Sequence, residues 1–167
     1  VCSSDLEYRN DAEELRNLAY LECVVREVAR CGKPVVIGEF GWYGGGKPTF
    51  DAGRHPAASE EQQARWCRRL VETTRGLAVG WLNWGFYDQP EATDASQLTG
   101  LFTTEGKEKA WGREFKRLAV ELGTARFAPK KLGSRPELDW DACLTSLKAV
   151  NDYRERYVEA FQLEHSQ

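Results

Sequence analysis

The stretch KPVVIGEFGWYGGG, residues 33–46, decides the fold. Residues 35–37 are apolar and β-branched with no polar alternation, which predicts a strand buried on both faces, as in a parallel sheet. Pro34 suits the first position of such a strand, because its missing N–H costs little there. Glu39 stands at the carboxyl end of the run, where parallel α/β folds build their sites. The pattern therefore predicts a strand that presents one carboxylate to an aromatic-lined cleft.

A second unit of the same kind follows along the chain. Ser59 and Gln62 form a capping-box pattern, which predicts the start of a helix. The inward face of this helix is expected to carry Trp66, Leu70, Thr73 and Thr74, and Gly76 is expected to end it. Residues 77–84 then predict the next strand. Strand, helix and strand within about 50 residues are typical of a βαβ unit.

The remaining elements are helices and long loops. A helix ending at Gly32 precedes the first strand, and loops of unusual length are expected over residues 44–56 and 85–106. A helix is predicted over 107–122, and residues 124–136 are expected to be irregular. One last amphipathic helix is predicted over 138–163, packed on the outside of the fold or on a partner. Its apolar face is expected to carry Leu144, Leu147, Val150, Tyr157 and Phe161.

Composition excludes several classes of partner. The chain has 167 residues, 41% of them apolar and 29% charged, which is typical of a soluble globular protein. A net charge of −3 implies no nucleic-acid partner, and no apolar run approaches the length needed to cross a membrane. Five scattered cysteines without a CxxC pair predict small buried side chains rather than a zinc site or a disulfide framework. Whether the protein is cytoplasmic or secreted is left open.

The strand of residues 33–41 resembles the seventh strand of the clan A glycoside hydrolases, closest to the cellulase-like (β/α)8 barrels of family 5. Lys-Pro, the apolar run and Glu-Phe-Gly occur in register with that strand. The resemblance implies a partial TIM barrel of class α/β, comprising helix 6 to helix 8 with strands 7 and 8, over residues 7–122. Residues 123–167 are then a linker and a C-terminal helical extension. Residues 1–6 resemble the translated end of a sequencing adapter and are set aside as an artefact.

The resemblance also implies a chemistry. Glu39 matches the catalytic nucleophile of a retaining glycosidase, whose second carboxyl group acts as acid and base. That second group follows strand 4 of the family, which is absent from this sequence, so no residue here is assigned to it. Trp84 matches the aromatic platform beneath the sugar at the cleavage point. The substrate would be a β-linked polysaccharide or oligosaccharide, and no metal or organic cofactor is implied.

Each assignment has a structural alternative. Glu39 could make a strand-end salt bridge, and Trp84 could be a core residue. Trp42 and Tyr43 could stack on neighbouring sugars or close the rim of the barrel. Asp88 could bind sugar hydroxyls or serve the structure of its loop, as could Asn83, and His55 is expected to be an exposed loop residue. Gly44-Gly45-Gly46 is interpreted as a flexible rim.

Two other functions compete with the glycosidase. One is a carbohydrate-binding barrel without catalysis, and the other is an unrelated barrel enzyme that uses Glu39 as a metal ligand or a base. Fold alone does not separate them. If the chain is a fragment, its strands should expose open sheet edges and apolar faces, and we expect it to associate or to be poorly soluble.

Overall fold

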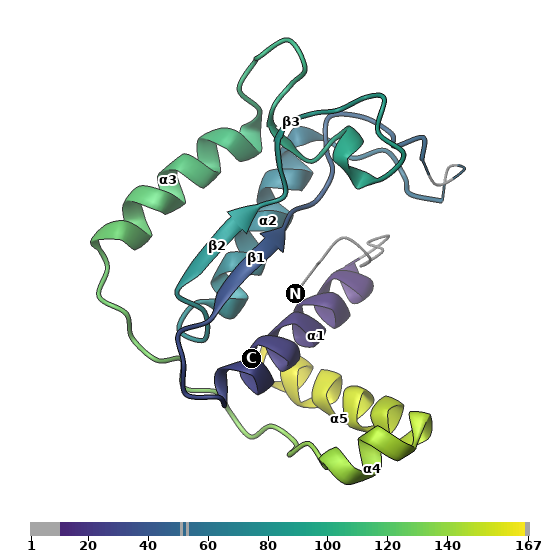
Figure 1. The fold of residues 1–167 in the computed structure, drawn as a ribbon, viewed down its shortest axis with the longest axis vertical. Helices are drawn as coiled ribbons and strands as arrows, with labels where there is room; N and C mark the ends of the chain where they lie inside the picture. Colours follow the sequence, from purple (N-terminus) through teal and green to yellow (C-terminus); the bar gives the residue numbers. More distant parts are fainter. Residues whose placement is uncertain (1–10, 51, 53, 166–167) are drawn as a thin grey trace.

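The computed structural model describes residues 11–50, 52 and 54–165, and the segment 1–6 therefore lies outside the described residues. The chain folds in the order α1, β1, α2, β2, β3, a short 3₁₀ helix η1, β4, α3, α4 and α5 (Figure 1). The bounds are α1 Asp11–Ala29, β1 Val36–Phe40, α2 Glu60–Thr74, β2 Gly80–Asn83, β3 Gly85–Tyr87, η1 Ala95–Gln97, β4 Gly100–Phe102, α3 Ala110–Thr124, α4 Trp140–Thr145 and α5 Leu147–His165. Helices and strands alternate from α1 to β2.

The predicted βαβ unit is confirmed. Strands β1 and β2 pair in parallel, and helix α2 connects them. Helix α2 begins with the predicted capping box, in which the Ser59 hydroxyl accepts from the Gln62 N–H and the Gln62 side chain accepts from the Ser59 N–H. Its predicted inward face is buried throughout, with Trp66 and Leu70 in the main apolar core. Helical periodicity and one cap thus suffice to place this helix.

The prediction that the first strand is buried on both faces is wrong. One face of the β1–β2 pair, which carries Ile37 and Phe40, packs against the helices and is buried. The other face is open, with Val36 53%, Leu82 58% and Trp84 44% exposed. The sheet formed by β1 and β2 has only two strands, and the described residues contribute nothing that covers this face. Burial on the second face would need partners outside the described residues.

The segment 85–106, predicted as a loop, contains a second small sheet. Strands β3 and β4 pair in parallel, with Gly85 opposite Gly100 and Tyr87 opposite Phe102. A Cβ at Gly100 would lie 2.3 Å from the Asp88 nitrogen and 2.5 Å from the Tyr87 carbonyl carbon, so only glycine fits there. The close approach of two glycines is what lets these short strands pair, and it leaves no apolar alternation for a sequence pattern to detect.

Helix α3 packs beside α2 on the buried face of the sheet (Figure 1). The predicted face of this helix is confirmed: Trp111 and Leu118 are buried, and Phe115 and Leu122 pack against the same core. The Phe40 ring meets Trp111 edge-on, with centroids 5.9 Å apart. This contact fixes the end of β1 against α3.

The side chain of Lys109, which precedes α3, is buried and ties three segments together. It is 1% exposed, and its ammonium lies 2.9 Å from both carboxylate oxygens of Asp88. The same ammonium donates to the carbonyl oxygens of Gly44 at 2.8 Å and Leu98 at 2.9 Å. Burial raises the pKa of the Asp88 carboxyl, while the neighbouring ammonium acts in the opposite direction. One cation thus joins the segment after β1, the segment after β3 and the start of α3.

The single last helix predicted over 138–163 is instead two helices, α4 and α5, separated at Ser146. The Ser146 backbone is extended, with φ −141° and ψ 113°, so the helix breaks there. Tyr157 and Phe161 of the predicted apolar face are buried, whereas Leu144 is 76% and Leu147 77% exposed. Helix α5 lies beside α1 (Figure 1), which settles what this extension packs against.

A buried carboxylate in α1 anchors the irregular segment 125–136. The Glu22 side chain is fully buried and accepts from Arg135 Nε at 2.9 Å, Lys130 Nζ at 2.6 Å and the Tyr157 hydroxyl at 3.2 Å. Arg135 also pairs with Glu164 in α5. Charged side chains in the core are tolerated only when they are paired and hydrogen-bonded, as these are. The segment is irregular as predicted, but it is held to α1 and α5 by ionic contacts.

The cysteines within the described residues are free thiols. Cys23 and Cys67 are buried as predicted, Cys143 is partly buried, and Cys31 is exposed, contrary to the prediction. Cys2 lies outside the described residues. No helix in the described part of the chain is long and apolar enough to cross a membrane.

We predict that Lys109→Met destabilises the chain by about 3–5 kcal/mol, because the Asp88 carboxylate is left buried without its cation. Lys107→Met is the matched control, since Lys107 is exposed, and it should change the free energy of unfolding by less than about 0.5 kcal/mol. Urea unfolding followed by tryptophan fluorescence measures both. The double variant Asp88→Asn, Lys109→Met should recover part of the loss. Equal stability of the two lysine variants would contradict the role of Lys109.

Candidate functional site

An irregularity in the pairing of β1 with β2 turns the Glu39 side chain onto the open face. Ile37 pairs with Trp81 and Phe40 with Asn83, so β1 uses three steps where β2 uses two. Val35 and Ile37 point into the core, and regular alternation would send Glu39 the same way. The extra residue instead leaves Glu39 exposed and returns Phe40 to the core. Bulges of this kind often re-aim a side chain beside a site.

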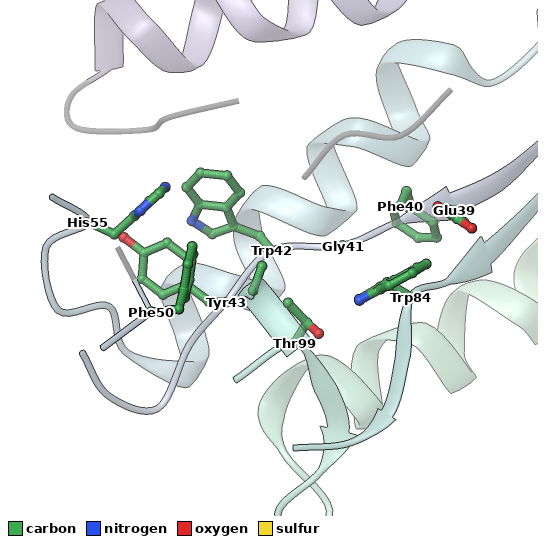
Figure 2. A pocket seen from close by; sticks show the side chains of 10 residues that line it. Glu39, Phe40, Gly41, Trp42, Tyr43, Phe50, His55, Trp84 and Thr99 are labelled. Atoms are coloured by element: carbon green, nitrogen blue, oxygen red, sulfur yellow. The ribbon is translucent and has the colours of Figure 1, made fainter. Parts of the chain in front are cut away.

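Glu39 and Trp84 line one hollow at the carboxyl ends of the two parallel strands (Figure 2). Trp84 directly follows β2, and its backbone N–H donates to the Phe40 carbonyl at 2.8 Å. Its indole N–H donates to Ser96 Oγ at 2.7 Å, which fixes the ring plane. Both residues were predicted to lie at strand ends, and the structure brings them together at one hollow. The indole N–H is, however, already used by Ser96.

The hollow continues along an aromatic wall built from the segment after β1. Trp42 and Tyr43 line it, and both are buried. The Tyr43 hydroxyl donates to the Pro56 carbonyl at 2.8 Å, and Trp42 packs on Trp66 of α2 with centroids 5.7 Å apart. These contacts favour the interpretation that the pair closes the rim. Their remaining accessible edges form part of the wall of the hollow.

His55 also belongs to this wall, although an exposed loop residue was expected. It is partly buried, and its ring lies 5.4 Å from Tyr43, 5.5 Å from Phe50 and 6.0 Å from Trp42, measured between centroids. Figure 2 shows this aromatic group at one end of the hollow and Glu39 with Trp84 at the other. The hollow is therefore elongated, with its carboxylate near one end.

The geometry of Asp88 and Asn83 favours their structural alternatives. Neither residue lines the hollow. The Asp88 carboxylate accepts from Lys109 and from the Gly100 N–H at 2.8 Å. The Asn83 amide donates to the Gly85 carbonyl at 2.6 Å and accepts from the Trp111 indole at 2.8 Å. Their hydrogen-bonding groups hold the loops in place, so we withdraw Asp88 from the candidate sugar-binding residues.

The glycine run after Tyr43 is a hydrogen-bonded crossing rather than the flexible rim that was predicted. Gly45 and Gly46 both donate to the Ala58 carbonyl, and the Ala58 N–H donates back to Gly46. A Cβ at Gly44 would lie 2.5 Å from Gln63 Cβ and 2.6 Å from the Ser59 carbonyl oxygen. Glycine is needed here because the loop passes directly over the start of α2.

Sequence reasoning missed three residues on or beside the hollow. Ala95 and Thr99 line it from the segment between β3 and β4, and Phe50 lines it from the loop after β1. Both segments were predicted only as long loops, and neither shows a helical or strand periodicity of apolar residues. Nothing in the local sequence predicts that residues 95–99 return to face Glu39.

No group of three or more His, Cys, Asp or Glu side chains among residues 11–50, 52 and 54–165 could hold a metal ion. Glu39 is the carboxylate that lines the hollow. The arrangement offers one exposed carboxylate, one half-exposed indole and an aromatic wall.

No protein-family model matches the chain, and no curated protein matches it. Solved structures do share its fold. A β-glucuronidase from Faecalibacterium prausnitzii is 25% identical with a TM-score of 0.53, over 73% of this chain and 21% of that one. The GH5_18 protein from Bifidobacterium longum subsp. longum is 20% identical with a TM-score of 0.54, over 70% of this chain and 28% of that one.

A variant of the same Bifidobacterium protein, solved in complex with Manβ1-4GlcNAc, matches with a TM-score of 0.55 and 20% identity over 71% of this chain. These neighbours are glycoside hydrolases, and the chain has a mixed helix and strand fold that matches part of theirs. It spans between a fifth and three tenths of the length of these structures.

Proposed function

We propose that this chain is the C-terminal part of a (β/α)8 barrel that hydrolyses β-linked glycosides with retention of configuration. In this proposal β1 and β2 are the last two strands of the barrel, and α1, α2 and α3 are helices 6, 7 and 8. The open face of the β1–β2 pair is then the face that the remaining strands would cover. Helices α4 and α5 are an extension packed on α1.

The observation that carries the proposal is the shared orientation of Glu39 and Trp84. Active sites of parallel barrels lie at the carboxyl ends of the strands, which is where both side chains meet. The irregular pairing in β1 places the Glu39 carboxylate on the open face. Such irregularities are common beside active sites, so a catalytic role for this carboxylate accounts for the irregular pairing. The structural alternative for Glu39, a simple strand-end salt bridge, does not explain why it lines one hollow together with an indole and an aromatic wall.

The chemistry assigned to Glu39 is a double displacement. Its carboxylate attacks the anomeric carbon, the glycosidic C–O bond breaks, and the leaving oxygen takes a proton from a second carboxylic acid. Water, deprotonated by that same second group, then hydrolyses the glycosyl ester and frees Glu39. The second group must lie about 5–5.5 Å from Glu39, and we assign it to no residue of this chain.

Trp84 is assigned to the sugar at the point of cleavage. An indole offers a flat apolar surface that stacks on the C–H face of a pyranose. The hydrogen bond to Ser96 holds the ring, so the stacking surface is organised before a sugar binds. The solved relative with a bound disaccharide supports a carbohydrate as the class of ligand.

We predict that Glu39→Gln in the full-length polypeptide lowers kcat for aryl β-glycosides by about 10⁴-fold or more, the loss typical of a missing nucleophile. Glu91→Gln is the control, because Glu91 is an exposed loop residue, and it should keep full activity. A 2-deoxy-2-fluoroglycoside should label the wild type on the peptide that contains Glu39, as read by mass spectrometry. Equal activity of the two variants would refute the assignment, and oligosaccharide binding without turnover in the wild type would favour the binding barrel.

We predict that Trp84→Leu lowers kcat/KM for the same glycosides by about 10-fold, because the stacking surface is lost. The unfolding midpoint should fall only modestly, through loss of the bond to Ser96, since the residue itself is 44% exposed. Trp81→Leu should instead spare kcat/KM: Trp81 lies on the helix side and donates to Thr74 Oγ1 at 2.8 Å, so its loss should lower stability without altering the hollow. Steady-state kinetics and thermal unfolding of both variants test the pair, and identical behaviour would count against the platform role.

A further inference from the structure

The hydroxyl of Thr99 is a buried polar group without a hydrogen-bond partner among the described residues. Thr99 is 3% exposed and lines the hollow together with Glu39 and Trp84 (Figure 2). Its backbone carbonyl accepts from the Asn83 amide, and the next residue begins β4. An unpaired buried hydroxyl costs about 1–3 kcal/mol, so its retention calls for a physical explanation.

The location of this hydroxyl points to a ligand. A Cβ at Gly85 would lie 2.9 Å from Thr99 Oγ1, so the hydroxyl rests against the residue that follows Trp84. Thr99 also lines the same hollow as Trp84, on whose indole surface we place a sugar. The Thr99 side chain can rotate about its Cα–Cβ bond between staggered rotamers. This rotation exchanges its hydroxyl and methyl groups, so the hydroxyl can face the hollow without a change in side-chain volume.

Other polar groups near this wall are already used inside the protein. The Trp84 indole N–H donates to Ser96, and the Tyr43 hydroxyl donates to Pro56. The Asp88 carboxylate is occupied by Lys109 and Gly100. These polar groups of Trp84, Tyr43 and Asp88 thus have partners inside the protein, whereas the Thr99 hydroxyl has none among the described residues.

We propose that Thr99 is a specificity-determining residue whose hydroxyl binds one ring hydroxyl of the sugar stacked on Trp84. The proposal rests on the proposed function and deepens it, because it assigns part of the sugar recognition to the segment between β3 and β4. A hydroxyl both donates and accepts, so it matches another hydroxyl better than it matches a charged group. A site built to hydrogen-bond a substrate hydroxyl strongly rejects the analogue that lacks it.

The experiment is a cycle between the side chain and the substrate. Thr99→Val replaces the hydroxyl with a methyl group of the same shape, and Thr99→Ser keeps the hydroxyl. Each full-length variant is assayed with an aryl β-glycoside and its 2-, 3-, 4- and 6-deoxy analogues. The wild type and Thr99→Ser should discriminate against one deoxy position by about 10-fold or more, and Thr99→Val should lose that discrimination at this position alone.

Stability provides the second readout. If the hydroxyl has no partner inside the protein, Thr99→Val should leave the unfolding midpoint unchanged or raise it. A clear loss of stability in Thr99→Val would show an internal partner and overturn the proposal. Discrimination that is unchanged in Thr99→Val at every deoxy position would also overturn it.

The same cycle can be measured as dissociation constants by calorimetry in the Glu39→Gln background, where turnover should be too slow to consume the ligand. Coupling at one ring position in these constants would uphold the role of Thr99 even if the wild type proved inactive, in which case the proposed catalysis alone would fail. Activity that depends on Glu39, without coupling to Thr99, would refute only the assignment of Thr99.

Discussion

The buried ammonium of Lys109 is the contact on which the shape of the site depends. The hollow is lined by segments that follow β1, β2 and β3. These segments have little regular secondary structure, so their conformation depends on contacts with the rest of the fold. Lys109 links two of them by binding the Gly44 and Leu98 carbonyls together with the Asp88 carboxylate. The α3 backbone beside it is held in turn, because the Ala110 N–H donates to Glu60 at the start of α2. The loops are therefore positioned by electrostatics against a helical scaffold rather than by strand pairing alone.

Much of the scaffold could be predicted from the sequence, because it follows from local rules. The capping box at Ser59 and the apolar period after it give α2 its start and its inward face. The apolar run before Glu39 and the run before Trp84 give two strands, and a helix between them makes the strands parallel neighbours. Glu39 and Trp84 could be placed at the same edge for this reason, without knowledge of any contact between them.

What could not be predicted depends on contacts between distant residues. Lys109, Glu22 and Thr99 look in the sequence like ordinary polar positions, and only the fold shows that all three side chains are buried. The second sheet was missed because it forms through the close approach of two glycines rather than through apolar alternation. The last helix was predicted to be continuous because its apolar residues recur at near-heptad spacing on both sides of Ser146. The backbone at Ser146 is in fact extended. Periodicity reports which residues share a face but not whether a neighbour covers that face.

The extra residue in β1 makes the site depend on backbone count more than on side-chain identity. Between Ile37 and Phe40 the strand holds two residues where its neighbour holds one, and this is what sends the Glu39 carboxylate outward. Uninterrupted alternation through residue 39 would instead direct the carboxylate toward the apolar side, at a cost of several kcal/mol. Two consecutive outward residues, Gly38 and Glu39, let the carboxylate reach the hollow while Phe40 stays in the core. Gly38 has open surroundings, so substitutions there should be tolerated as long as this irregular pairing is kept.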